Sequence, residues 1–225
     1  MMRERQRFLL AADEQDDAAL ASTDLGLIWT SITNAVPLAM LTVLYIIADP
    51  ILLHRVRASL RDEGAIIPSS TGGKEEVTIG VAKVLANPLL QAVYAETLRL
   101  YVQAYVTQCS AHQGVTVGRW WLDQNGVVMV SSYANHMNKQ LWNEGSDGAH
   151  PVQTFWADRF LRYPQDPLSG PHRRSTPSCS SNTEVPPARI DKASTRRPLF
   201  SLAGLEGMWI PYGGTSACSN LLAYY

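Results

Sequence analysis

A glutamate and an arginine, Glu96 and Arg99, are the first residues whose spacing points to chemistry. They are the only formally charged residues between Lys83 and Arg119, and on a helix they share one side. Attraction between buried charges offsets the cost of their dehydration only if further hydrogen bonds complete the set. The pattern therefore predicts a third partner, for which Arg159 is the candidate. The alternative is an ordinary exposed pair worth a few tenths of a kcal/mol.

A cysteine in the last part of the sequence is the second candidate. Cys218 follows the run PYGGTSA, in which Gly213 and Gly214 let the backbone fold tightly and aim N–H groups at the sulfur. Such groups favour the thiolate, which is the form of cysteine that binds a metal. The alternative is a buried cysteine that only fills space, which is common for this residue type.

The third feature is a proline inside a long apolar stretch. No formal charge occurs from Leu25 to Ala48, and Pro37 lies near the middle of this stretch. In a helix, Pro37 donates no hydrogen bond and crowds the carbonyl of Thr33, so we expect a bend beside Thr33 and Asn34. The bend is either purely structural or the lining of a ligand cavity.

A helix over this stretch would also be long enough to cross a membrane. However, polar residues cluster before Pro37, and Asp24 and Asp49 flank the stretch where Lys or Arg anchors are usual. We therefore expect a helix buried inside a protein, which begins at Ala18 or Ser22 and ends before Pro50. A membrane span is the alternative.

Further elements are predicted downstream. A short helix over 51–61 precedes the loop PSSTGGK, and a helical pattern restarts near Glu75. Asn87 followed by Pro88 is typical of a helix start, and that helix should end near Tyr101. The runs VTVGRWW and GVVMVSS flank an Asn-Gly turn, which predicts a β-hairpin over 115–132.

Composition limits the class of protein and divides the chain. The 225 residues are 46% hydrophobic and 17% charged, with a formal net charge of −1, which argues against a nucleic-acid-binding protein. A run rich in Pro, Ser, Arg and Thr predicts an irregular excursion over 163–200. We expect a helical part with a β-hairpin over 1–162, this excursion, and a cysteine-containing loop over 201–225.

In their order along the chain, these features resemble the C-terminal part of a cytochrome P450, a heme-thiolate monooxygenase. ETLR, residues 96–99, is similar to the family's E-x-x-R, WADRF to the turn that supplies an interlocking arginine, and PYGGTSAC to the loop of the heme-ligating cysteine. WTSITNAVP resembles the W-A-S-x-A-N-x-x-P of the branch with sterol 7α-hydroxylase, prostacyclin synthase and many fungal secondary-metabolite enzymes. The resemblance implies a mainly α fold with a small β-hairpin or sheet, as an incomplete cytochrome P450 fold. Its parts would be a central long helix, the E-x-x-R helix, the hairpin, the meander and the cysteine loop.

The resemblance also implies roles for the candidate residues. Cys218 is expected to be the axial ligand of heme iron, in a cofactor-binding loop with Gly213 and Gly214. Asn34 and Thr33 are expected to be the catalytic residues, facing the oxygen and organising water for proton delivery.

A structural triad and external partners complete the implied picture. Glu96, Arg99 and Arg159 are expected to brace the fold behind the heme. The substrate is expected to be a lipophilic small molecule of secondary metabolism. Electrons are expected to come from a separate flavin-containing NADPH reductase, since the chain has no G-x-G-x-x-G of its own. The compartment is unknown: such enzymes sit on the endoplasmic reticulum through an N-terminal anchor, which we expect to be absent here.

Departures from the family pattern keep other readings open. The cysteine loop is one residue shorter than usual, Ser219 and Asn220 follow it in place of Pro-Gly, and Gln108 stands where an arginine usually pairs with a heme propionate. The expected consequence is weaker heme binding, because a charge-assisted contact is missing. One alternative is therefore a truncated, inactive fragment of such an enzyme, and another is a small single-span membrane protein.

Overall fold

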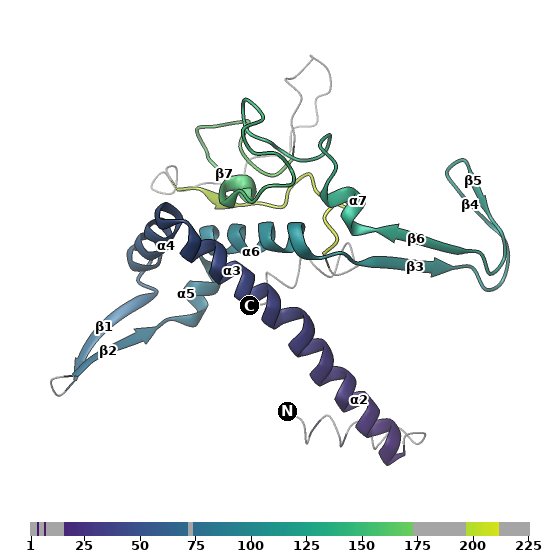
Figure 1. Ribbon diagram of the computed structural model, residues 1–225, viewed down its shortest axis with the longest axis horizontal. Coiled ribbons are helices and arrows are strands. Elements are labelled where there is room, and N and C mark those ends of the chain that lie inside the picture. The colour runs from purple at the N-terminus through teal and green to yellow at the C-terminus, as the bar shows by residue number, and fades with distance from the viewer. Residues whose placement is uncertain (1–3, 5–6, 8–15, 72–73, 173–196, 212–225) are drawn as a thin grey trace, which may run out of the picture. The chain divides into compact units, whose positions relative to one another are not determined.

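The computed structural model of the chain describes residues 4, 7, 16–71, 74–172 and 197–211 (Figure 1). The chain divides into two compact units, Met1–Tyr45 and Ile46–Tyr225, and each is described by itself.

The first unit is built around one long helical segment. It consists of helix α2 (Asp17–Thr30), a π-helical turn η1 (Ser31–Ala35) and helix α3 (Val36–Ala48), whose last residues belong to the second unit. The expected helix and its end before Pro50 are confirmed. The π-helical turn ends two residues before Pro37, where its wider hydrogen-bonding pattern accommodates a residue without an N–H. Beside it, the Thr33 hydroxyl donates to the Trp29 carbonyl at 2.8 Å.

The expectation that this helix is buried is wrong for the described structure. Of its large apolar side chains, Leu20 and Leu38 are buried, whereas the following are exposed: Leu25, Leu27, Ile28, Trp29, Ile32, Val36, Met40, Val43, Leu44 and Ile47. The described residues of the first unit do not cover these side chains. By length and composition, the helix from Asp17 to Ala48 is able to cross a membrane, and within the described residues it is the one helix that meets this criterion.

Exposure on this scale predicts the behaviour of the isolated chain. A contiguous apolar surface binds hydrophobic dyes and promotes association. We expect the purified 225-residue chain to enhance ANS fluorescence strongly and to need detergent to stay monomeric in size-exclusion chromatography. A monomer without detergent, with little dye binding and one cooperative unfolding transition, would contradict this expectation.

The second unit begins with a capped helix and a hairpin. Helix α4 (Pro50–Asp62) is capped at its N-terminus by Asp49. The Oδ1 of Asp49 accepts from the N–H groups of Ile51 and Leu52 at 2.8 and 3.1 Å. Strands β1 (Ile66–Thr71) and β2 (Lys74–Ile79) then pair antiparallel, and the short helix α5 (Val81–Ala86) follows.

The β1–β2 hairpin corrects two expectations, a loop over PSSTGGK and a helix from Glu75. Its ladder pairs residues from Ile66 with Ile79 to Thr71 with Lys74. Six backbone pairs across a short connection outweigh the weak helical periodicity of this segment, and the β-branched residues of KEEVTI suit a strand.

The central helix of the second unit is α6 (Pro88–Tyr101), which begins and ends where the sequence predicts. The Asn87 side chain caps it by accepting from the N–H of Leu90 at 3.0 Å, and Pro88 occupies the first turn. Leu89, Ala92 and Val93 form the buried stripe, and the burial continues to Arg99.

The predicted pairing over 115–132 is wrong, although the strands themselves exist. The run GVVMVSS supplies β6 (Val127–Ser131), which pairs with β3 (Tyr105–Cys109), and VTVGRWW folds on itself as β4 (Val115–Val117) and β5 (Trp120–Leu122). Gly118 makes this inner hairpin possible because its φ of 59° lies in the left-handed region. The turn inside VTVGRWW thus competes successfully with the Asn-Gly turn as the centre of a hairpin.

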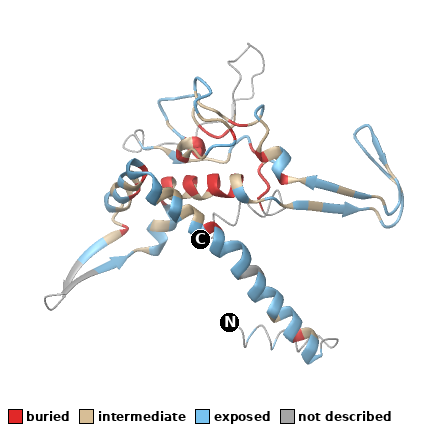
Figure 2. Cartoon of the chain, viewed as in Figure 1, coloured by how far each residue is buried: buried red, intermediate tan, exposed pale blue. Residues whose placement is uncertain are grey.

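The rest of the second unit consists of irregular segments laid over α6. Helix α7 (Ser132–His136), the 3-10 turn η2 (Ala157–Phe160) and strands β7 (Leu161–Arg162) and β8 (Leu199–Phe200) all contact α6. Figure 2 shows buried residues concentrated on α6 and in these neighbouring segments. The large side chains of this core include Trp142, Val152, Phe160, Leu161, Leu205, Trp209 and Ile210.

Candidate functional site

The structure brings Glu96, Arg99 and Arg159 together in the core of the second unit. All three side chains are fully buried. Arg99 donates to both oxygens of Glu96, from Nε to Oε2 and from Nη2 to Oε1, each at 2.8 Å. Arg159, on η2, donates from Nε to Oε1 of Glu96 at 3.0 Å. One carboxylate therefore lies between two guanidinium groups from distant parts of the chain.

The second guanidinium also holds the irregular segment that surrounds it. Arg159 Nη1 donates to the carbonyl of Asn143, and Nη2 lies 3.2 Å from the carbonyls of His150 and Pro151 and 3.3 Å from that of Thr154. Burial lowers the pKa of Arg159, while the charge of Glu96 opposes this shift. The carbonyl oxygens replace part of the water that the cation has lost, so it stays charged.

Arg99 makes a corresponding contact on the other side. Its Nη1 donates to the carbonyl of His136 at 2.8 Å, and its guanidinium lies 5.2 Å from the centre of the Trp142 ring, at cation–π distance. Trp142 is itself fully buried, and its Nε1 donates to the carbonyl of Asn135 at 2.8 Å. Both arginines thus tie backbone carbonyls to the carboxylate of Glu96.

A second, more exposed ion pair joins α4 to the same turn. Arg55 binds Asp158 through both terminal nitrogens, at 3.0 and 2.5 Å, and the Tyr163 hydroxyl donates to Asp158 at 3.0 Å. Asp158 raises the pKa of Arg55, and burial with the nearby carboxylate raises that of Tyr163 to about 12. Both partners are partly exposed, at 37% for Arg55 and 23% for Asp158, so solvent screens this pair.

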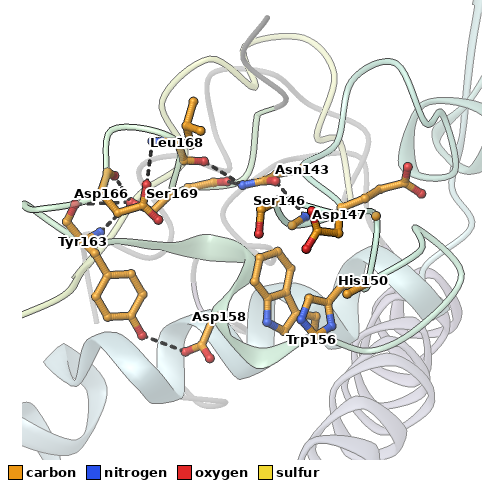
Figure 3. Close-up of a pocket in the computed structure, with 15 residues that line it drawn as sticks. Asn143, Ser146, Asp147, His150, Trp156, Asp158, Tyr163, Asp166, Leu168 and Ser169 are labelled. Atoms are coloured by element: carbon orange, nitrogen blue, oxygen red, sulfur yellow. Dashed lines mark hydrogen bonds between the residues drawn. The ribbon is translucent and has the colours of Figure 1, made fainter. Parts of the chain in front are cut away.

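A cavity of about 640 Å³ lies beside this turn, lined by residues from Asn143 to Gly170 (Figure 3). Its wall includes the His150 ring stacked on Trp156 at a centroid distance of 4.2 Å, and the Arg159 guanidinium lies 5.3 Å from the Trp156 ring. Trp156 also donates its backbone N–H to Glu96 Oε1 at 3.2 Å. The cavity therefore borders the buried network without including Glu96.

The other candidate residues do not lie in this network. Thr33 and Asn34 belong to the π-helical turn of the first unit. Gly213, Gly214 and Cys218 lie outside the described residues. Gln108 and Cys109 are exposed on β3, and Cys109 is a free thiol. Among the described residues, no group of three or more His, Cys, Asp and Glu side chains could hold a metal ion.

Sequence reasoning missed His136, which is fully buried at the end of α7. Its Nε2 accepts from the backbone N–H of Ile210 at 3.3 Å, so this nitrogen carries no proton. Burial, followed by the charge of Arg99, lowers the pKa of His136 to about 4. The sequence signal for it is a histidine four residues after the strand-like run GVVMVSS, which is too common to be diagnostic.

Comparison with known proteins identifies relatives over most of the chain. Cytochrome P450 monooxygenase fsoE of Humicola fuscoatra is 35% identical over 215 residues, which cover 94% of this chain and 35% of that protein. Cytochrome P450 monooxygenase efuG of Hormonema carpetanum is 32% identical over 212 residues, with coverages of 93% and 35%. For calL of Penicillium decumbens the identity is 29% over 196 residues. No protein-family model matches the chain.

Over most of its length, the chain therefore resembles proteins that are named cytochrome P450 monooxygenases. More particularly, it is similar to fungal cytochrome P450 monooxygenases, and it spans about a third of the length of the curated relatives that it matches. A mainly helical chain with small antiparallel sheets is compatible with part of that fold.

Removing the shared carboxylate should strongly destabilise the second unit. Glu96→Ala leaves two buried guanidinium groups without a counter-charge, which should cost about 3–5 kcal/mol of unfolding free energy. The matched control is Arg55→Ala, which breaks the partly exposed ion pair and should cost about 1 kcal/mol or less. Urea denaturation followed by circular dichroism measures both. Equal losses for the two variants would contradict the central place of Glu96.

Burial of a neutral histidine predicts a specific pH dependence. The pKa of His136 is about 4 in the folded chain and about 6.5 when unfolded, so the unfolded state binds more protons between these values. The contribution to stability is complete above pH 6.5 and is lost as the pH falls through 4, a change of about 3 kcal/mol.

The measurement is the free energy of unfolding at pH 7 and pH 4.5 in paired variants. His136→Gln should reduce the acid sensitivity, whereas His54→Gln, at an exposed position on α4, should leave it unchanged. An acid sensitivity that is the same in His136→Gln and in the unmutated chain would refute the assignment.

Proposed function

We propose that the chain is part of a heme-dependent monooxygenase of the cytochrome P450 family, which oxidises a lipophilic small molecule in fungal secondary metabolism. The observation that carries this proposal is the buried carboxylate of Glu96 bound by Arg99 and Arg159, the residues that match the family's E-x-x-R and WADRF motifs. Similarity to named fungal monooxygenases over most of the chain supports the same class.

The proposal gives each part of the chain a counterpart in the family fold. The helix over α2, η1 and α3 corresponds to the central helix, α6 to the E-x-x-R helix, and the irregular segment up to residue 162 to the meander. Residues 163–200 are proposed to be an excursion and 201–225 the cysteine loop. The π-helical turn before Pro37 supports the first of these counterparts, because it sets the polar residues Thr33 and Asn34 at an irregularity in an apolar helix.

Cys218 is proposed to ligate the heme iron, with Gly213 and Gly214 shaping its loop. When bound, heme with a thiolate ligand supplies the chemistry of dioxygen activation. The hydroxyl of Thr33 and the amide of Asn34 are proposed to order water for proton delivery. Thr33 donates to the carbonyl of Trp29, so its hydroxyl oxygen remains able to accept a hydrogen bond from water.

Glu96, Arg99 and Arg159 are proposed to brace the fold and not to react. Their side chains are hydrogen-bonded to one another and to backbone carbonyls. We therefore assign them no role in proton transfer. The proposed partners are a flavin-containing NADPH reductase and a lipophilic substrate, as for the family.

A second candidate is a chain of the same family that does not bind heme. The neutral, exposed Gln108 at the position of a propionate-binding arginine favours it, as do Ser219 and Asn220 after the cysteine. Loss of the Pro-Gly that follows the cysteine also removes a start signal for a helix whose positive end would stabilise the thiolate.

Heme reconstitution decides between the two candidates. The 225-residue chain is expressed with heme supplementation, reduced with dithionite and exposed to CO. Thiolate ligation by Cys218 predicts the red-shifted, thiolate-type Soret band of the reduced CO complex. Cys218→Ala should abolish this band and Cys109→Ala, at the exposed cysteine of β3, should preserve it. No band in the unmutated chain would favour the second candidate.

A further inference from the structure

The segment that leads toward Cys218 is attached to the core by few polar contacts. Residues 205–211 are its last described part, and Leu205, Trp209 and Ile210 are buried. Most of the backbone hydrogen bonds in this segment are local, such as that from Trp209 to Leu205 at 3.1 Å. Among the described residues, the hydrogen bond that reaches another element runs from the Ile210 N–H to Nε2 of His136, at 3.3 Å, and the Trp209 ring packs on Phe160 with centroids 5.9 Å apart.

The ion network binds the backbone of His136, whereas the side chain contacts Ile210. The carbonyl of His136 accepts from Arg99 Nη1 at 2.8 Å, and its ring lies edge-on to Trp142 with centroids 6.4 Å apart. Trp142 in turn lies against the Arg99 guanidinium. The backbone of His136 is therefore fixed by Arg99, while its side chain contacts a segment 74 residues further along the chain.

The imidazole is chemically suited to this bridge. It must offer an unprotonated nitrogen to Ile210, and its surroundings favour the neutral ring. The groups that face it are the positive charge of Arg99 and the negative charge of Glu96 on α6, and the carbonyls of Arg99 and Val102. Burial and Arg99 disfavour a proton more than Glu96 and the carbonyls favour it.

We propose that His136 is a positioning residue, which transmits the fixed geometry of the Glu96–Arg99 pair to residues 205–211 and so to the entry of the Cys218 loop. The role in a heme site rests on the function proposed above, but the contact between His136 and Ile210 does not. In this scheme, the buried ion network determines the position of residues 205–211, and the imidazole of His136 connects the network to them.

The test is amide hydrogen exchange of the Ile210 N–H in the full 225-residue chain. His136→Leu removes the acceptor and should speed exchange at Ile210 about tenfold, the effect of losing one buried hydrogen bond. His136→Gln can place an oxygen near the position of Nε2 and should restore most of the protection. Amides of α6 between residues 92 and 99 should be unaffected in both variants.

A matched control is available in His150. Its carbonyl also accepts from an arginine of the network, Arg159, but its side chain stacks on Trp156 and does not reach residues 205–211. His150→Leu should leave exchange at Ile210 unchanged. Unchanged exchange in His136→Leu, equal loss in the Leu and Gln variants, or equal acceleration throughout α6 would each overturn the proposal.

The same variants separate this inference from the proposed function. If the unmutated chain shows the thiolate-type CO band, His136→Leu should reduce the intensity of that band, and His136→Gln should retain it. If the unmutated chain shows no such band, the proposed function fails, while the exchange experiment still decides the role of His136.

Discussion

One buried carboxylate determines how the second unit is put together. Glu96 loses all contact with water and would be strongly destabilising alone, but it is bound by Arg99, three residues along the chain, and by Arg159, 63 residues along. The arrangement carries one more positive than negative charge. That excess is tolerated because the remaining guanidinium N–H groups are directed at backbone carbonyls, which are fixed partial negative charges.

This constraint explains why a segment with little regular secondary structure is ordered. Residues 137–156 form no long helix or strand, so their backbone carbonyls need partners from elsewhere. Arg159 supplies partners to several of them, and Arg99 binds the carbonyl of His136, directly before this segment. The aromatic core of Trp142, Phe160 and Trp209 then packs beneath the network, with ring centroids 5.6 and 5.9 Å from Phe160.

Sequence predicts those features of this unit that depend on local chemistry or on charge balance. The α6 helix follows from Asn87 and Pro88, and the need for a third charged partner follows from a charge-free neighbourhood. The β1–β2 hairpin and the pairing of β3 with β6 are not predicted, because they depend on which of several turns closes first. His136 and the carbonyl acceptors are also missed. Every residue has a backbone carbonyl, so the sequence does not show which of them accept hydrogen bonds from the arginines. The exposed face of the helix from Asp17 to Ala48 differs from expectation because periodicity shows that a face is apolar but not what covers it.

The most direct test of the central claim is the coupling energy between Glu96 and Arg159. A double-mutant cycle with Glu96→Gln and Arg159→Gln, read out as unfolding free energies in urea, isolates the pair from its surroundings. The network described here predicts a coupling of about 2 kcal/mol or more, since both groups are buried and bonded to each other. A coupling within about 0.5 kcal/mol of zero would show that the two residues act independently and would contradict the account.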